Sequence, residues 1–211
     1  MEALVENLTY VSLSKIPNHL IAEMIDGKPY YYKNYEQVLT NKKTLNDIMG
    51  ASTLQGFIVT YLTRLLMALP EDDFHLFLNE TGIHIDNKTN LSGDILIFDA
   101  SKPLIIDVHY ANQPPLVNIE IDVNIALEQE DEKDYILKKT KKLLDFGVEK
   151  VIWVLTKSQK IMVATPSDTL IVVSWDKDVE ILRGVHFNVA AYLKKKGVIN
   201  GLSDDFLNER F

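Results

Sequence analysis

The stretch from Val117 to Val123, VNIEIDV, places two carboxylates on one side of an alternating apolar and polar pattern. Successive side chains of a strand point to opposite faces, so Glu120 and Asp122 would share a face with Asn118. The apolar residues at positions 117, 119, 121 and 123 would share the other face. Two interpretations are open: the polar side is the wet face of an ordinary strand, or it is one wall of an active site.

An earlier stretch, DILIF, carries a carboxylate on a strand of a different kind. Asp94 shares its predicted face with Leu96 and Phe98, while Ile95 and Ile97 fill the other. A strand that is apolar on both faces is typical of the middle of a sheet, where an unpaired carboxylate is costly. We therefore expect Asp94 at the entry of a central strand.

Two predicted helices each place one polar side chain on an otherwise apolar arc. In the helix that ends at Phe146, Lys139 lies inside the inward arc, while Lys138 and three other polar residues lie outside it. A lysine there must reach water or meet a carboxylate. In the helix that begins at Ser52, Gln55 lies on the apolar arc, and its amide needs a partner, which backbone groups could also supply.

Together these four side chains form a chemically coherent set. Asp94 and Glu120 offer the hard oxygen ligands that suit Mg²⁺ or Mn²⁺. Such an ion lowers the pKa of bound water, and the Lys139 ammonium would assist the attacking water and stabilise an anionic transition state. With Gln55 in support, the set predicts a metal-dependent phosphodiesterase.

The elements that would position these residues alternate between helices and strands. The pattern predicts helices over 52–69, through Phe146 and over 189–195, and strands over 94–99 and 116–123. It also predicts a hairpin from VIWVLT and KIMVAT, a strand near TLIVVSW, and two strands around an Asn79–Gly82 turn within 73–86. His75 and His84 would face each other across the latter hairpin, in a structural role. This order implies an α/β fold with a mixed central sheet flanked by helices.

The chain length and composition favour one domain over residues 1–211, with a short, irregular N-terminal extension (1–50) packed on the core and a polar tail (197–211). The absence of cysteine excludes disulfides and thiolate metal sites, and suits the cytoplasm. A net charge of −8 disfavours avid nonspecific binding to nucleic acid. No stretch is long and apolar enough to cross a membrane, and no hydrolase elbow, Walker loop or dinucleotide fingerprint is present.

In the order of these helices, strands and polar residues, the sequence resembles the Uma-two family of the PD-(D/E)XK nuclease superfamily, from about Gln55 to Ala164. The specific features are the pair SGDILIF and VNIEID, the helix with an inward lysine, and FGVEKVIWV, similar to the family's GV-x-x-x-W entry into a strand. By position, Asp94 and Glu120 match the two motif acids, with Gly93 where proline is common. Asp122 stands where the superfamily usually has lysine, and Lys139 matches a lysine moved to the following helix. Gln55 stands where the family often has histidine.

The resemblance implies a restriction-endonuclease-like core and a homodimeric, Mg²⁺- or Mn²⁺-dependent DNA endonuclease. Asp94 and Glu120 would bind the metal, with the main-chain carbonyl of Ile121 and the Asp122 carboxylate as further candidate ligands. The alternatives are a catalytically inactive module that binds nucleic acid or a protein partner, which the net charge and Asp122 favour, and an oligomerising domain whose polar strand face is merely wet. The last would leave Lys139 exposed and far from Asp94.

Overall fold

The computed structural model describes residues 16–123, 126, 131–167 and 169–198. Its helices are α1 (Tyr35–Leu39), α2 (Thr53–Leu66), α3 (Glu132–Phe146) and α4 (Val189–Lys195), with short 3₁₀ helices at Asn18–Leu20 and Leu45–Asp47. Its strands are β1 (Ile21–Ile25), β2 (Lys28–Tyr31), β3 (Phe74–Asp86), β4 (Thr89–Asp99), β5 (Val117–Ile121), β6 (Lys150–Leu155), β7 (Lys160–Thr165), β8 (Thr169–Ser174), β9 (Val179–Leu182) and β10 (Val185–Phe187).

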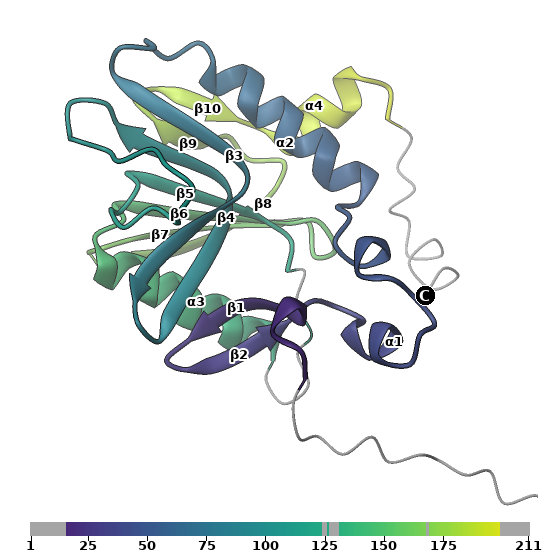
Figure 1. The fold of residues 1–211 in the computed structure, drawn as a ribbon. Helices are drawn as coiled ribbons and strands as arrows, with labels where there is room; N and C mark the ends of the chain where they lie inside the picture. The colour runs from purple at the N-terminus through teal and green to yellow at the C-terminus, as the bar shows by residue number, and fades with distance from the viewer. Residues whose placement is uncertain (1–15, 124–125, 127–130, 168, 199–211) are drawn as a thin grey trace, which may run out of the picture.

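The centre of the fold is a mixed, eight-stranded sheet with helices on both faces (Figure 1). Seven strands follow the order β2-β1-β4-β5-β6-β7-β8, and β3 pairs with β4. Strands β5 and β6 are parallel because α3 crosses between them, whereas the other pairs are antiparallel. The predicted α/β fold with a mixed central sheet is confirmed.

Each face of the sheet has its own apolar core. Helix α2 contributes Ile58 and Leu62 to the first core, where they join Ile119 of β5. Helix α3 contributes Ile136 and Leu143 to the second core, on the opposite face. Every residue of β5 is consequently buried, so the interpretation of its polar side as a wet strand face is wrong.

Strand β4 explains where the polar residues gather. Its long pairing with β3 occupies one edge, so β1 and β5 must share the other. Strand β1 pairs with β4 at Asn90, and β5 pairs with it from Ile95 to Ile97. Between these two contacts no described strand pairs with this edge of β4, so side chains can approach it. Ser92 and Asp94 lie in this interval.

The predicted hairpin within residues 73–86 is wrong. The structure has one long strand there, β3, with a bulge between Leu78 and Thr81 where a turn was expected. His75 and His84 therefore lie on the same strand and do not face each other, and His84 Nδ1 bonds Asn90 Oδ1 at 2.6 Å. Turn-like residues were misread because a bulge and a turn both need unusual backbone angles.

Four of the described strands lie where the sequence predicted none, two in the N-terminal region and two between β8 and α4. β1 and β2 extend the main sheet, and β9 and β10 form a separate two-stranded ribbon. The predicted helices, the β6–β7 hairpin and the β8 strand are confirmed. Most of the predicted tail and part of the acidic stretch before α3 lie outside the described residues. No helix in the described ranges is long and apolar enough to span a membrane.

Candidate active site

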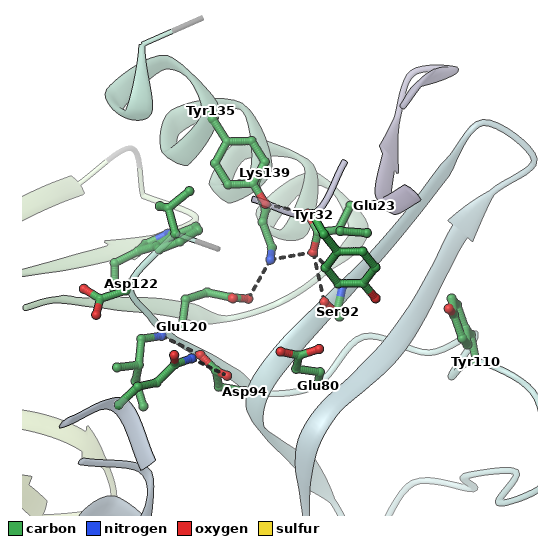
Figure 2. Close-up of a pocket in the computed structure, with 15 residues that line it drawn as sticks. Glu23, Tyr32, Glu80, Ser92, Asp94, Tyr110, Glu120, Asp122, Tyr135 and Lys139 are labelled. Atoms are coloured by element: carbon green, nitrogen blue, oxygen red, sulfur yellow. Dashed lines mark hydrogen bonds and ion pairs between the residues drawn. The ribbon is translucent and has the colours of Figure 1, made fainter. Parts of the chain in front are cut away.

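A small cavity of about 100 Å³ lies at the open interval of the β4 edge, beneath α3 (Figure 2). Six elements of the fold, among them the bulged strand β3, supply its polar wall. The titratable side chains that line it are Glu23 of β1, Tyr32, Glu80 of β3, Asp94 of β4, Tyr110, Glu120 of β5, Asp122, and Tyr135 and Lys139 of α3; Gln55 of α2 completes the polar set. The four predicted site residues, Asp94, Glu120, Lys139 and Gln55, thus come together.

Asp94 is held by two donors from different elements. The main-chain N–H of Ile121 donates to Oδ2 at 2.7 Å, and the Gln55 amide donates to Oδ1 at 3.3 Å. Burial raises the pKa of the Asp94 carboxyl above its usual value, and these donors together with Lys139 oppose the rise. Hydrogen bonds therefore orient the carboxylate, which has no ion-pair partner within 4 Å in the part of the chain that the structure describes.

Gln55 reaches Asp94 because α2 begins where it does. Ser52 caps the helix by accepting a hydrogen bond from the main-chain N–H of Gln55 at 3.1 Å. This places Gln55 in the first turn, buried, with its amide directed at the end of the Asp94 side chain. The predicted inward position of Gln55 is confirmed.

Glu120 is buried and lies against a cation. Lys139 Nζ lies 3.0 Å from Glu120 Oε1, and the Asn118 amide donates to the same oxygen at 2.7 Å. Burial raises the pKa of Glu120 to about 8; Lys139 lowers it, and the charges of Asp94 and Glu23 add to the rise. The site therefore has more negative charge than its one ammonium can offset.

Lys139 occupies the inward position that the helical periodicity predicts. Its side chain is 3% exposed, and it lies one helical turn from the equally buried Tyr135. Burial disfavours its charge, but Glu120 and Glu23 outweigh burial and raise the pKa of Lys139. An exposed lysine, as a merely structural strand face would leave, is excluded.

Asp122 lies at the cavity, but its carboxylate is directed away from Lys139 (Figure 2). Both carboxylate oxygens accept hydrogen bonds from Thr156, one from the main-chain N–H and one from the hydroxyl, each at 2.6 Å. Asp122 has a φ of +62°, so β5 ends there and its alternation breaks. Val123 consequently packs in the α3 core, and its predicted place on the same side as Val117 is wrong.

The bulge in β3 brings a carboxylate that the sequence analysis missed. Leu78 pairs with Ile95 and Thr81 pairs with Gly93, so the extra residue lies directly opposite Asp94. Asn79 and Glu80 both have positive φ, and Glu80 lines the cavity. Desolvation, then the charge of Asp94, raises the pKa of Glu80. Only the turn-like residues of this segment marked it in the sequence.

Glu23 of β1 is the second carboxylate that the sequence analysis missed. It is 4% exposed and binds Lys139 Nζ at 2.7 Å, across 116 positions of the chain. The stretch IAEMI, in which Glu23 is the one polar residue, could have marked a carboxylate on an otherwise apolar strand. Nothing local could have indicated that β1 lies beside α3.

The donor set suits a hard divalent cation. Five carboxylates and one ammonium line the cavity; Thr156 occupies both oxygens of one of them, Asp122, which leaves Glu23, Glu80, Asp94 and Glu120. Carboxylate oxygen is the preferred ligand of Mg²⁺ and Mn²⁺. Burial raises the pKa of three of these carboxyls, Glu80, Asp94 and Glu120, and the charges of neighbouring carboxylates add to the rise. Within the described residues, no three acidic or histidine side chains already have metal-binding geometry. Asp94 and Glu120, from adjacent strands, are the residues that could hold such an ion.

Comparisons with known proteins address the fold. Family models and curated proteins gave no match to the sequence. Among solved structures, the chain is similar to the crystal structure of a putative nuclease belonging to DUF820 from Anabaena variabilis, with a TM-score of 0.58 and 17% identity. The match covers 86% of this chain and 94% of that one.

The chain has the fold of that DUF820 protein. This likeness confirms the resemblance at the level of the fold, a mixed central sheet flanked by helices. An identity of 17% does not carry an activity from one chain to the other. An activity can therefore be inferred only from the side chains at the cavity.

Proposed function

We propose that the chain is a Mg²⁺- or Mn²⁺-dependent DNA endonuclease that hydrolyses phosphodiester bonds. The observation that carries the proposal is that Asp94 and Glu120, from adjacent strands, line one cavity with the buried ammonium of Lys139. The likeness in fold to a putative nuclease adds support by analogy.

In this proposal Asp94 and Glu120 hold the cation, with the main-chain carbonyl of Ile121 as a further ligand. Gln55 keeps Asp94 in one orientation through its 3.3 Å hydrogen bond. Asp122 is left out of the ligand set because Thr156 already satisfies both of its oxygens. A cation bound here would lower the pKa of a water molecule and offset charge on the phosphate.

Lys139 contributes the positive charge of the protein itself. During hydrolysis the water oxygen forms a bond to phosphorus and loses a proton to solvent. The bond from phosphorus to the leaving ester oxygen breaks, and that oxygen takes up a proton from solvent. The Lys139 ammonium would donate to the attacking water and to a non-bridging phosphate oxygen, where negative charge grows. Homodimer formation, expected from the resemblance, remains a prediction.

The first test is a calorimetric titration of Mn²⁺ into the wild-type protein, Asp94→Asn and Asp145→Asn. We expect saturable binding to the wild type and to Asp145→Asn, whose carboxylate is exposed on α3, and no binding to Asp94→Asn. Equal binding by all three proteins would contradict the proposed site. Cleavage of DNA by the wild type but not by Lys139→Ala would then establish the reaction.

The second candidate is an inactive module that binds nucleic acid or a protein partner. One observation favours it: Lys139 is the single basic side chain among the described residues at the cavity, and both its neighbours are glutamates. If Lys139 stayed paired with both Glu23 and Glu120, Glu120 would not be available as a ligand. The protein would then bind Mn²⁺ weakly and would not cleave DNA. The same titration therefore separates the two candidates.

A further inference from the structure

Glu23 has no role in the reaction proposed above, yet it is the nearer of the two carboxylates beside Lys139. Its Oε1 lies 2.7 Å from Lys139 Nζ, compared with 3.0 Å for Glu120 Oε1. Both glutamates are buried, so neither contact is a surface ion pair of small effect. Lys139 is thus shared between two acids, one of which we propose as a metal ligand.

The two glutamates are anchored very differently. Glu23 accepts four hydrogen bonds: Oε1 accepts from Lys139, from Ser92 N–H at 2.9 Å and from Ser92 Oγ at 3.1 Å, and Oε2 accepts from the Tyr135 hydroxyl at 2.5 Å. These donors belong to β4 and α3, so the carboxylate is fixed by two elements of the core. Figure 2 shows Tyr135, Lys139 and Ser92 converging on it.

Glu120 has fewer restraints. Its Oε1 accepts from Asn118 and Lys139, and no donor in the described ranges is bonded to Oε2. A carboxylate with a free oxygen next to a cavity can rotate toward a cation, whereas Glu23 would have to break four hydrogen bonds to do so. When Glu120 turns, the ammonium loses one partner and must keep the other, since an unpaired buried ammonium is costly.

We propose that Glu23 is the positioning residue that retains the Lys139 ammonium when Glu120 turns to bind the cation. This inference rests on the proposed function. Glu23 touches neither substrate nor metal in this scheme. It fixes the height of Lys139 above the β5 strand, so that the ammonium stays in the cavity with its remaining N–H groups directed at the reacting water and phosphate.

The change in the partners of Lys139 can be followed by NMR of the lysine ammonium groups and the glutamate carboxyls. The variant is Glu23→Gln, which keeps the shape of the side chain and removes its charge. Lys139 is assigned with Lys139→Arg. The wild type should show a protected Lys139 ammonium signal with and without saturating Mg²⁺. Glu23→Gln should show it without Mg²⁺, because Glu120 still pairs with it, and should lose it when Mg²⁺ draws Glu120 away.

The matched control is Tyr135→Phe, which removes one hydrogen bond from Glu23 but leaves its charge and its contact with Lys139. Tyr135→Phe should behave as the wild type, and Glu23→Asp should recover part of the signal with Mg²⁺. With DNA as substrate, Glu23→Gln should lower kcat roughly 10²-fold with little change in KM. Adding Glu23→Gln to Lys139→Ala should cause no further loss.

Three results would overturn the inference, and they differ from one another. If the Lys139 signal in Glu23→Gln survives Mg²⁺ as in the wild type, Glu23 does not retain the ammonium. If the signal is already absent before Mg²⁺ is added, Glu23 only supports the burial of Lys139. If Mg²⁺ leaves the Glu120 carboxyl signal of the wild type unchanged, the proposed cation site itself is wrong, whatever Glu23 does.

Discussion

The two faces of β5 are equally buried but chemically opposite. Ile119 and Ile121 are 0% and 1% exposed and pack into the apolar core beneath α2. Asn118 and Glu120, their immediate neighbours, are 0% and 6% exposed and face α3. The same strand therefore separates an ordinary core from a buried polar network.

The two faces of β5 differ in how much their burial stabilises the fold. Burying isoleucine stabilises the fold by removing apolar surface from water. Burying a lysine among glutamates gains little or nothing for stability relative to an apolar core, because the desolvation of the charges offsets their attraction. A strand whose two faces are equally dry has no structural need for this network, which suggests a role in binding or chemistry.

The largest predicted effect on stability is that of Lys139→Met. It removes the ammonium that lies between Glu23 and Glu120, so we expect a loss of about 3–5 kcal/mol in the free energy of unfolding. On the other face, Ile119→Val should lose only about 0.5–1.5 kcal/mol. Urea denaturation measures both.

The same pair of variants also separates charge from packing. Millimolar Mg²⁺ should restore part of the stability of Lys139→Met, since a cation can replace the lost charge, but should do little for Ile119→Val. If Lys139→Met were as stable as the wild type, the two glutamates would not depend on the ammonium. The two faces of β5 would then not differ in their sensitivity to substitution.

The next effect is a pH dependence confined to the polar face. The pKa of Glu120 is about 8 in the folded protein against 4.5 for the free side chain, so the folded state binds the proton more tightly. The stability from this group is present below pH 4.5 and is lost as pH rises through 8. Over that range the wild type should lose on the order of a few kcal/mol relative to Glu120→Gln, measured by urea denaturation from pH 5 to 9.

Ile119→Val serves as the control, because it should follow the pH profile of the wild type. Parallel profiles for the wild type and Glu120→Gln would mean that Glu120 is ionised throughout and that the excess negative charge lies elsewhere. The sign is decisive here, since a carboxylate stabilised by Lys139 alone would make the wild type gain stability with rising pH.

The sequence predicted the residues whose placement depends on local geometry. The helical period alone indicates that Lys139 and Gln55 face inward, and the strand period puts Glu120 opposite Ile119 and Ile121; all of these placements are confirmed. These patterns hold because a helix or strand fixes its own side-chain directions before any tertiary contact forms.

The acids that the sequence analysis missed depend on long-range contacts. Glu23 meets Lys139 only because β1 pairs with β4 at Asn90, a register that no local pattern encodes. Glu80 enters the cavity only because β3 bulges, and its segment is equally typical of a turn. Asp122 was correctly placed next to the site, but its positive φ and its partner Thr156 depend on the end of β6.

A substitution of Asp122 tests whether the metal-binding residues extend beyond the end of β5. Asp122→Asn keeps a residue that tolerates positive φ but weakens the two hydrogen bonds from Thr156. We expect a loss of about 1–2 kcal/mol in stability and no change in Mn²⁺ affinity, measured by urea denaturation and calorimetry. A large loss of Mn²⁺ affinity with unchanged stability would make Asp122 a ligand and would extend the polar face beyond β5.

The smallest effect is expected for Glu80, whose side chain lies at the edge of the polar face and partly in water. Glu80→Gln should weaken Mn²⁺ binding about fivefold, as for a single charge acting through a solvated space, and should leave stability nearly unchanged. Asn79→Gly is the matched control, because it relieves the positive φ of the bulge while keeping the Glu80 charge. If neither variant alters Mn²⁺ affinity in calorimetry, the bulge only bends β3. If Glu80→Gln alone weakens binding, the bulge directs a carboxylate at Asp94, and β3 joins β1, β4 and β5 in the polar network.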